Sequence, residues 1–377
     1  MRKSNVRSSI CGNESLASQK ILVIHPYFYI IGGAEQVLLK ILEALVEQKQ
    51  DCSLLGELPE DSTFNNLYTL NVKQISYSDT NFRPTRFPTH QCLLRHLKLQ
   101  NKLRKKVGKM DLEVSTQEPM YFIGAGKKRV AYIHFPANLT RMQNSNLKHR
   151  WFWKLFYSPI TFQLRQQIKR VDLLICNSYY TQRAIMDCWG REAEVIYPPV
   201  DVESFKPLQK ELLVVSVGRF VPTKNYELIV EVAKQMPDVQ FIIAGRKSLN
   251  DSYYDKIVSL KPDNLTLDAN ATLDNVSVLL GRAKVYLHCM VGEHFGISVG
   301  EAMAAGCVPV VHDSGGPVEI VSGLGFLYDD VEECVKAVRK ALQSTVDPQV
   351  FVEHARLFGV DVFKKNFVSL LEKNNLL

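Results

Sequence analysis

Leu212-Leu-Val-Val-Ser-Val-Gly-Arg-Phe-Val-Pro-Thr-Lys224 sets the architecture expected for this chain. A short apolar run of this kind is typical of a strand that is buried on both faces of a parallel sheet. After the glycine loop, apolar residues recur at helical spacing at Leu228, Ile229, Val232, Ala233 and Met236. This spacing gives a helix one apolar face. A strand, a loop and a helix in this order form the repeating unit of a parallel α/β sheet.

The same unit begins near the N-terminus, where Ile21-Leu-Val-Ile24 is a second short apolar run. A helical face then follows, made of Ala34, Val37, Leu38, Ile41, Leu42 and Leu45. Further strand candidates at Val239–Ala244, Val285–His288 and Val308–Val311 alternate with helical stretches. Because 377 residues suffice for two cores, we expect an α/β fold of two Rossmann-like, doubly wound domains that face each other across a cleft.

The predicted domain boundary is Val195-Ile-Tyr-Pro-Pro-Val-Asp201, because two consecutive prolines favour an extended connector. We expect a flexible leader at residues 1–19, a first Rossmann-like domain at 20–197 and a second at 198–357. Residues 358–377 are expected to form a helix that packs back towards the first domain. Doubly wound sheets bind ligands at the carboxyl ends of their strands, which places the expected site between the domains.

The composition, with 46% hydrophobic and 23% charged residues, is that of an ordinary globular protein. No apolar run approaches the ~18 residues that span a bilayer. Residues 1–20 lack the apolar segment of a signal peptide, so we expect a cytoplasmic protein. The His, Cys and carboxylate residues show no convincing metal-ligand spacing, and we expect no metal site.

The net charge of +7 is unevenly distributed. Residues 1–200 carry 28 basic and 16 acidic residues, residues 201–377 carry 18 and 23, and segment 83–170 alone carries 19 and 3. This asymmetry favours an anionic partner, such as a membrane surface, a phosphorylated lipid or nucleic acid. A solvated basic face explains it equally well. Because no nucleic-acid recognition module is present, we expect no nucleic-acid partner.

Two segments of the basic half have the pattern of membrane-surface structures. Lysines and arginines surround an apolar stripe at helical spacing, formed by Leu99, Leu103, Val107 and Met110. The aromatic residues of 151–157 lie between Arg150 and Arg165, as suits a lipid headgroup layer. Either stripe could instead pack against the sheet of the first domain. Together with the charge, they favour peripheral attachment to an anionic membrane.

The richest candidate site is Gly292-Glu-His-Phe-Gly-Ile-Ser-Val-Gly-Glu301, where a strand end and a loop run into a helix. Free N–H groups at the helix start suit an anion such as a pyrophosphate. The Glu301 carboxylate, just inside the helix, can accept hydrogen bonds from ribose hydroxyls. Ser298-x-x-Glu301 also matches a capping box, which needs no ligand. Gly315-Gly316 alone matches an ordinary turn.

Other polar residues are expected at the same sheet edges. Arg219 and Lys224 follow a strand and are suited to clamp a diphosphate. Gly32-Gly33 would let the backbone approach a ligand at a helix start, although a plain tight turn is as natural. His134 ends an apolar run and is either a buried core histidine or a polar group in the cleft.

These motifs resemble, in kind and in order, those of the retaining glycosyltransferases of family 4. Glu293 and Glu301, followed by Ser314-Gly-Gly-Pro317, look like the E-x7-E signature of that family. Corresponding motifs of the family are matched by Gly32–Glu35, by Tyr197–Asp201 and by Gly218-Arg219 with Lys224. The resemblance covers the chain from about Ile21 to its C-terminus.

Within the family, Glu293-His-Phe-Gly-Ile297 and Tyr132-Ile-His-Phe-Pro136 are most similar to the mannosyltransferases of lipid-linked oligosaccharide assembly. The closest likeness is to the GDP-mannose-dependent α-1,2-mannosyltransferases of asparagine-linked glycosylation. The resemblance implies the GT-B fold, with the acceptor bound by the first domain and the nucleotide sugar by the second. It also implies attachment to the cytoplasmic face of a membrane and a lipid-pyrophosphate-linked glycan acceptor.

The resemblance further implies roles for single residues. Arg219 and Lys224 would neutralise the donor diphosphate, and Glu301 would hold the donor ribose. The donor sugar's hydroxyls would be bound by Glu293 and by the backbone of Phe295, Gly296 and Ile297. Gly33 would let its loop approach the phosphate and the acceptor, and His134 would contact the sugar near the reacting carbon. Catalysis, with retention and without metal or other cofactor, would then fall to His134 and Glu293.

Three alternatives stay open at this point. A UDP-sugar is an alternative donor, with another lipid or a polysaccharide as acceptor. A sugar-nucleotide epimerase or a glycogen-type phosphorylase could share the architecture, although a phosphorylase needs a pyridoxal lysine and no lysine is marked as one. A non-catalytic nucleotide-sugar-binding module is the third, and the presence of all the motif residues argues against it.

Overall fold

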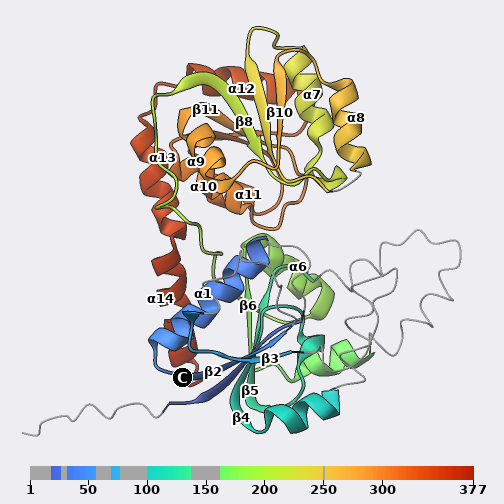
Figure 1. Ribbon diagram of the computed structural model, residues 1–377, viewed down its shortest axis with the longest axis vertical. Coiled ribbons are helices and arrows are strands. Elements are labelled where there is room, and N and C mark those ends of the chain that lie inside the picture. Colours follow the sequence, from blue (N-terminus) through green and yellow to red (C-terminus); the bar gives the residue numbers. More distant parts are fainter. Residues whose placement is uncertain (1–17, 27–31, 57–68, 77–99, 137–161, 249–250) are drawn as a thin grey trace, which may run out of the picture.

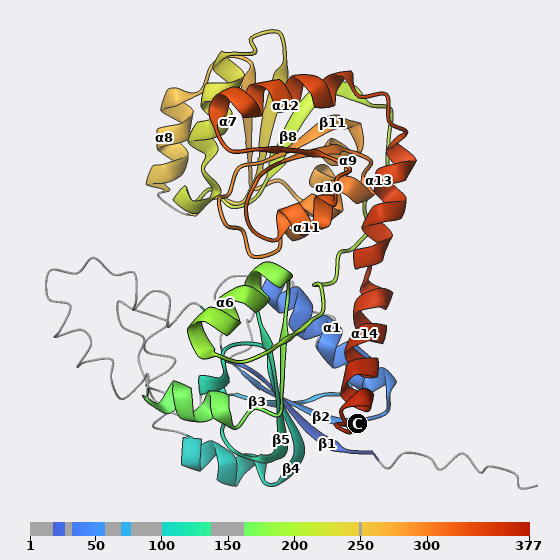
Figure 2. The ribbon, with the colours of Figure 1, turned by 180° about the vertical axis from the view of Figure 1, so that it is seen from behind.

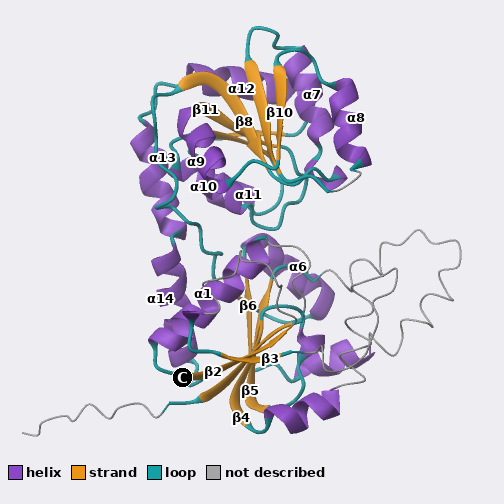
Figure 3. Cartoon of the chain, viewed as in Figure 1, coloured by secondary structure: helices purple, strands orange, loops and turns teal. Residues whose placement is uncertain are grey.

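The computed structural model describes residues 18–26, 32–56, 69–76, 100–136, 162–248 and 251–377. These residues form two α/β domains, one above the other along the longest axis of the molecule (Figure 1). Each domain has a single sheet with helices on both faces (Figure 3). The expected α/β fold with two Rossmann-like domains is therefore confirmed.

The first domain contains a parallel sheet in the order β3-β2-β1-β4-β5-β6-β7. Its strands are β1 (Lys20–His25), β2 (Asp51–Gly56), β3 (Lys73–Ile75), β4 (Met110–Ser115), β5 (Gly126–Ile133), β6 (Leu173–Cys176) and β7 (Glu194–Val195). Alternate side chains of β1 supply the two cores. Ile21 and Val23 pack with helix α1 (Gly33–Glu47), while Leu22 and Ile24 pack on the other face, which α6 (Tyr179–Trp189) helps to cover.

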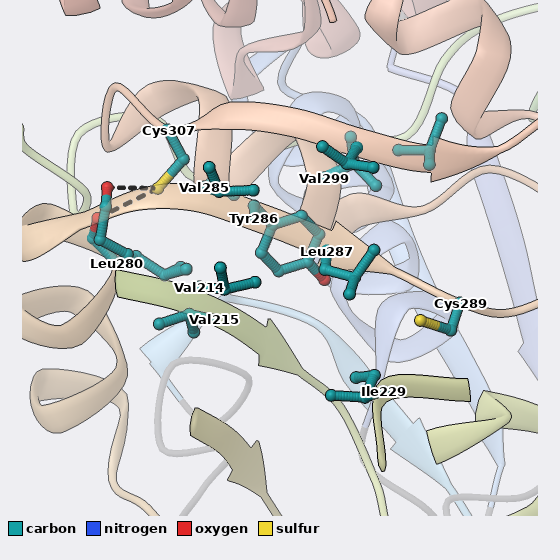
Figure 4. Close-up of a cluster of buried hydrophobic side chains, with 14 of the residues drawn as sticks. Val214, Val215, Ile229, Leu280, Val285, Tyr286, Leu287, Cys289, Val299 and Cys307 are labelled. Carbon is teal, nitrogen blue, oxygen red and sulfur yellow. Dashed lines mark hydrogen bonds between the residues drawn. The ribbon is translucent and has the colours of Figure 1, made fainter. Parts of the chain in front are cut away.

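The second domain repeats this arrangement, with a parallel sheet in the order β10-β9-β8-β11-β12-β13. Its strands are β8 (Glu211–Val217), β9 (Gln240–Gly245), β10 (Leu265–Ala269), β11 (Ala283–His288), β12 (Val308–His312) and β13 (Phe326–Tyr328). Its helices are α7 (Tyr226–Lys234), α8 (Ser252–Leu260), α9 (Leu273–Arg282), α10 (Ile297–Ala304), α11 (Pro317–Val321), α12 (Val331–Gln343) and α13 (Pro348–Ala355). The core lies on both faces of β8 and β11, and Figure 4 shows Val214, Tyr286 and Leu287 within it.

The chain passes between the domains twice. It leaves β7 and enters β8 through residues 196–210, and it returns through the short 3-10 helix η4 (Arg356–Phe358). The two crossings touch each other, because the Val200 N–H donates to the Phe358 carbonyl over 2.8 Å. The last helix, α14 (Val360–Lys373), lies beside α1 in both views (Figures 1 and 2), and its Phe363 and Phe367 are buried in the first core.

The apolar stripe assigned to a membrane surface belongs instead to the core of the first domain. Leu103 and Met110 are 4% and 7% exposed, and Val107 packs against the same cluster. The interfacial interpretation of this stripe is therefore wrong, because the sheet itself needs an apolar cover on that face. The basic side chains of helical residues 100–107 are exposed. Leu99 and the aromatic residues of 151–157 lie outside the described residues.

Within the ranges that the structure describes, no helix combines the length and the apolarity needed to cross a bilayer.

Candidate functional site

The site is built where the strand order reverses in each sheet. In the first sheet the reversal lies between β1 and β4, and in the second between β8 and β11. Doubly wound sheets bind ligands at these points, at the carboxyl ends of the strands. The two carboxyl edges face each other, because Phe135, which follows β5, stacks on His294, which follows β11. Their ring centroids are 4.1 Å apart and their planes differ by 5°.

Lys224 and Glu293 form an ion pair at the second reversal point. Lys224 ends the 3-10 turn η3 (Pro222–Lys224) after β8, and Glu293 lies in the loop after β11. The Lys224 Nζ donates to the Glu293 Oε2 over 2.6 Å. Burial would raise the pKa of the Glu293 carboxyl, but the Lys224 ammonium outweighs it and holds this pKa at about 2. Glu293 is therefore ionised at neutral pH.

His288, at the end of β11, lies next to this pair. Its Nε2 lies 3.8 Å from the Glu293 Oε2. Burial lowers the pKa of the His288 imidazole to about 4, and the Lys224 ammonium adds to the effect. The ring is thus neutral at pH 7, and its contact with Glu293 is not an ion pair there. Sequence reasoning did not identify His288, which reads from sequence as the last residue of a buried strand.

Arg219 supplies a second cation beside the Lys224 turn. It follows Gly218 directly after β8, and its side chain is exposed. No hydrogen bond or salt bridge occupies its guanidinium in the part of the chain that the structure describes. An exposed guanidinium with free donors is suited to bidentate contact with phosphate.

Glu301 lies in the second turn of α10, and the capping-box interpretation of this residue is wrong. The helix begins at Ile297 with Gly296 as its N-cap, so Ser298 is already inside the helix. The Ser298 Oγ accepts from the Tyr286 hydroxyl over 2.7 Å instead of capping the helix. Withdrawal from water raises the pKa of the Glu301 carboxyl to about 7, and the nearby Asp201 carboxylate adds to the rise. Among the described residues, no hydrogen bond or salt bridge satisfies this carboxyl.

The segment from Phe295 to Ile297 offers its backbone to the site. The Phe295 side chain is 3% exposed and stacks on Tyr197 at 5.6 Å, which leaves only its backbone available. Gly296 has φ of +101°, a conformation that side-chain-bearing residues rarely adopt. Ile297 reaches across to the first domain: a Cβ on Gly33 would lie 2.7 Å from the Ile297 Cδ1.

The loop at Gly315-Gly316 is more than an ordinary turn, because it packs directly on the backbone of the Glu293 loop. The Gly316 N–H donates to the Glu293 carbonyl over 2.8 Å. A Cβ on Gly315, whose φ is +79°, would overlap that carbonyl oxygen, and one on Gly316 would overlap the His294 carbonyl. Only glycine permits this approach. The sequence signal was present in the glycine pair, but the close contact depends on the tertiary fold.

His134 follows β5 at the carboxyl edge of the first sheet. Its Nε2 is buried and has no hydrogen-bond partner among the described residues. Burial lowers the pKa of its imidazole to about 4, with a contribution from His25. The His134 carbonyl accepts from the Asn177 Nδ2 over 3.0 Å and from the Thr181 Oγ1 over 3.3 Å. The residue is thus firmly held and neutral at pH 7, with one free ring nitrogen.

Glu35 was not singled out as a site residue, yet it shapes the glycine loop. Its Oε2 accepts from the Gly32 N–H over 2.8 Å, at the N-terminus of α1. Its Oε1 lies 3.6 Å from the His25 Nε2, and the His25 Nδ1 is 2.7 Å from the Thr116 Oγ1. The spacing of a glutamate three residues after a helix N-cap is the sequence signal that indicates such a contact.

The structure therefore brings Arg219, Lys224, Glu293 and Glu301 to one edge of the second sheet, with Gly33 and His134 on the facing edge. Cations at this edge can bind a diphosphate, and carboxylates beside them can accept from hydroxyl groups. Within the described residues, no three His, Cys, Asp or Glu side chains are grouped as metal ligands.

The chain matches two family models over most of its length. Residues 31–204 match the model described as Glycosyltransferase Family 4, and residues 201–358 match the one described as Glycosyl transferases group 1.

The chain is a glycosyltransferase, because both models describe such enzymes and together they cover residues 31–358.

Several relatives of this glycosyltransferase carry the name GDP-Man:Man(3)GlcNAc(2)-PP-Dol alpha-1,2-mannosyltransferase. The Caenorhabditis elegans protein is 28% identical over 66% of this chain and 64% of its own length. The mouse protein is 25% identical over 99% of this chain and 90% of its own length. The Xenopus laevis protein is 29% identical, and the chain spans about half of it, 48%.

Solved structures confirm the fold expected of such a glycosyltransferase. Sucrose-phosphate synthase from Thermosynechococcus elongatus matches with a TM-score of 0.73 and 16% identity, over 94% of this chain and 98% of its own. The Anabaena protein HepE, in complex with UDP and glucose, matches with a TM-score of 0.69 and 18% identity, over 94% and 99%. The two-domain GT-B arrangement implied by the sequence is thus confirmed.

Proposed function

We propose that this chain is a retaining, metal-independent hexosyltransferase that moves mannose from GDP-mannose to a lipid-pyrophosphate-linked oligosaccharide. The observation that carries the proposal is the row of groups at the carboxyl edge of the second sheet. There the Lys224–Glu293 pair lies next to an exposed Arg219, and Glu301 has no protein partner among the described residues. The names of the relatives supply the donor and the class of acceptor.

In this proposal the second domain binds the donor. Arg219 and Lys224 bind the diphosphate, because two cations beside one sheet edge match its charge. Glu301 accepts hydrogen bonds from the ribose hydroxyls, which satisfies a carboxyl that has no partner among the described residues. Glu293 and the backbone from Phe295 to Ile297 accept from and donate to the hydroxyls of the hexose.

The reaction breaks the bond between the sugar C1 and the diphosphate oxygen. The acceptor hydroxyl oxygen forms the new bond to C1 on the same face, and its proton passes to the departing phosphate. Arg219 and Lys224 stabilise the charge that develops on this phosphate. His134 is neutral, and its free Nε2 lies on the facing edge, where it can contact the sugar near C1. No protein nucleophile is needed in this scheme.

The acceptor is proposed to bind the first domain, which carries the basic residues. A pyrophosphate-linked lipid supplies both the anionic group that such a surface attracts and a reason for attachment to a membrane. We propose that the protein works at the cytoplasmic face of a membrane, in the assembly of the glycan for protein glycosylation. Nucleic acid is not among the proposed partners.

The purified full chain tests this proposal with a panel of GDP- and UDP-sugars, with and without dolichyl-pyrophosphate glycans. We expect turnover with GDP-mannose and the lipid-linked glycan, insensitive to chelators, and an α-linked product. Turnover with a UDP-sugar but not with GDP-mannose would overturn the donor assignment. Transfer that persists after Glu293→Ala would overturn the role of this edge as the active site.

A further inference from the structure

The first turn of α6 contacts the loop that carries Glu293 across the domain boundary. Ser178 is the N-cap of α6, and its Oγ accepts from the Thr181 N–H over 3.1 Å. The same hydroxyl donates to the His294 carbonyl over 2.6 Å. Ser178 is fully buried, so water does not compete for this bond. One side chain thus caps a helix of the first domain and fixes the loop of the second.

Glu319 makes the reciprocal contact from the second domain. Its Oε2 accepts from the Tyr179 N–H over 2.9 Å, and its Oε1 accepts from the Tyr180 N–H over 2.7 Å. The first N–H groups of a helix have no acceptor within the helix, and the helix dipole favours a negative charge there. Glu319 therefore completes the N-terminus of α6 in the other domain. Its helix, α11, and α6 lie on the facing sides of the two domains (Figure 1).

Glu319 is also tied to the Glu293 loop within its own domain. Gly316, the N-cap of α11, donates its N–H to the Glu293 carbonyl over 2.8 Å. Glu319 follows in the first turn of the same helix. The loop and Glu319 are thus two parts of one unit, which the first turn of α6 contacts at His294 and at Glu319.

The same turn of α6 holds the candidate catalytic histidine of the first domain. Asn177 and Thr181, on either side of Ser178, both donate to the His134 carbonyl, over 3.0 and 3.3 Å. The first turn of α6 therefore bonds to the residue after β5 in one domain and to the loop after β11 in the other. Among the described helices, no other N-terminus hydrogen-bonds both to His134 and to the loop after β11.

We propose that Ser178 and Glu319 are positioning residues, which form an interdomain clasp that sets His134 and Glu293 against the same sugar. This clasp, defined as the bonds of Ser178 and Glu319 across the domain boundary, rests on the proposed function because it assembles that site. The side chains proposed to bind the diphosphate and the ribose, Arg219, Lys224 and Glu301, all belong to the second domain. A donor can bind there with the clasp broken, but the sugar then lacks His134 from the first domain.

Substitutions at Ser178 separate positioning from folding. Ser178→Thr keeps both bonds and should retain parental activity. Ser178→Asp keeps an acceptor for the Thr181 N–H, and aspartate is a good N-cap, so α6 stays capped. Its carboxylate cannot donate to the His294 carbonyl, so we expect kcat to fall about tenfold while the donor Kd stays within about twofold.

Substitution at Glu319 tests the other half of the clasp. Glu319→Ala should lower kcat about tenfold without changing donor Kd, and Glu319→Gln, which keeps one acceptor oxygen, should fall between it and the parent. Small-angle scattering of the donor-free protein should show a larger radius of gyration for Glu319→Ala and Ser178→Asp. The exposed Glu353→Gln, which breaks a surface pair with Arg356, is the matched control and should change neither quantity.

The outcomes separate the clasp from the reaction itself. If Ser178→Asp and Glu319→Ala keep parental kcat and radius of gyration, the clasp is refuted. If they lose donor binding together with kcat, or if Ser178→Thr does not rescue, the residues have a general structural role and the proposal is also refuted. If the parent transfers no sugar from any donor, the proposed function fails, and the scattering measurement still decides whether the clasp holds the domains together.

Discussion

The side-chain nitrogen of Lys224 lies 2.6 Å from the Oε2 of Glu293, although 69 positions separate the two residues in the sequence. Each follows a strand, β8 or β11, and these strands are neighbours in the second sheet. The side chains are 18% and 16% exposed, so the pair is shielded but within reach of a ligand. A diphosphate that binds Lys224 would compete with Glu293 for the ammonium and would leave the carboxylate available to sugar hydroxyls.

Lys224→Met should therefore act on the donor site in two ways. It removes a cation from the diphosphate, for which we expect kcat/KM to fall about a hundredfold. It also leaves the largely shielded Glu293 carboxylate without its ammonium partner, so the pKa of Glu293 should rise from about 2 towards or above its ordinary value of 4.5. Protonation of Glu293 should then lower kcat/KM at a higher pH than in the parent. Measurement of kcat/KM over a series of pH values will test this.

The stability of the Lys224 variant should follow the same linkage. The pKa of Glu293 is lowered in the folded protein, so its pair contributes stability above pH 4.5, and this contribution is lost as pH falls towards 2. Parent and variant should thus differ most near neutrality and converge in acid. The exposed pair of Lys256 and Glu227 is the control, since Lys256→Met should change stability little. Equal pH profiles for parent and Lys224→Met would contradict the assignment.

Glu301→Gln should stabilise the protein while it weakens donor binding. Burial raises the pKa of Glu301 to about 7, so the folded state binds a proton that the unfolded state releases near pH 4.5. Stability is therefore lost as pH rises from 4.5 to 7, and the neutral amide removes this loss. We expect a higher Tm than the parent at pH 8, little difference at pH 4.5, and a donor KM raised about tenfold through the weakened ribose contact. A Tm gain that does not depend on pH would contradict the burial argument.

The sequence allowed the sheets and their edge residues to be predicted for a definite reason. Short apolar runs at Ile21–Ile24 and Leu212–Val217, each followed by a helical pattern, restrict the chain to parallel βαβ units. In such units the residues that follow the strands meet at one edge of the sheet, so the sequence alone predicts that Arg219 and Glu293 lie near each other. The ion pair between Lys224 and Glu293 could not be predicted, because local sequence patterns do not specify the order of strands in a sheet.

What the sequence could not show are contacts that depend on the meeting of the two domains. Ser178 donates to the His294 carbonyl, and Glu319 accepts from the Tyr179 and Tyr180 N–H groups. No sequence motif indicates either contact, because both require α6 and α11 to face one another. The opposite error occurred at Leu103, where a basic amphipathic pattern suggested a membrane surface. The apolar face of that helix covers the first sheet. An amphipathic pattern predicts that the apolar face is buried, but it does not specify whether a membrane or the protein's own sheet buries it.

His134 should matter for catalysis rather than for donor binding. Its Nε2 has no hydrogen-bond partner among the described residues and lies on the edge of the first domain, whereas the side chains proposed to bind the diphosphate and the ribose lie on the second. His134→Ala should lower kcat about a hundredfold and leave the donor Kd unchanged within about twofold. Burial holds the pKa of the ring at about 4, so the parent should show no rate change between pH 5 and 8 that depends on His134. Loss of donor binding in the variant, measured by calorimetry, would contradict this division of roles.

Gly315→Ala and Gly323→Ala together test whether the Glu293 loop needs a glycine beside it. Both glycines have the same backbone conformation, with φ of +79° and +81°, so both substitutions cost about 1–2 kcal/mol of backbone strain. A Cβ on Gly315 would overlap the Glu293 carbonyl, whereas one on Gly323 meets no atom within 4 Å. We therefore expect Gly315→Ala to lose about 1–3 kcal/mol more than Gly323→Ala, because the loop must move to remove the overlap. Moving the loop displaces Glu293, so only Gly315→Ala should also raise the donor KM. Urea unfolding and donor kinetics on both variants check this, and equal losses at the two positions would mean that the loop does not rest on Gly315.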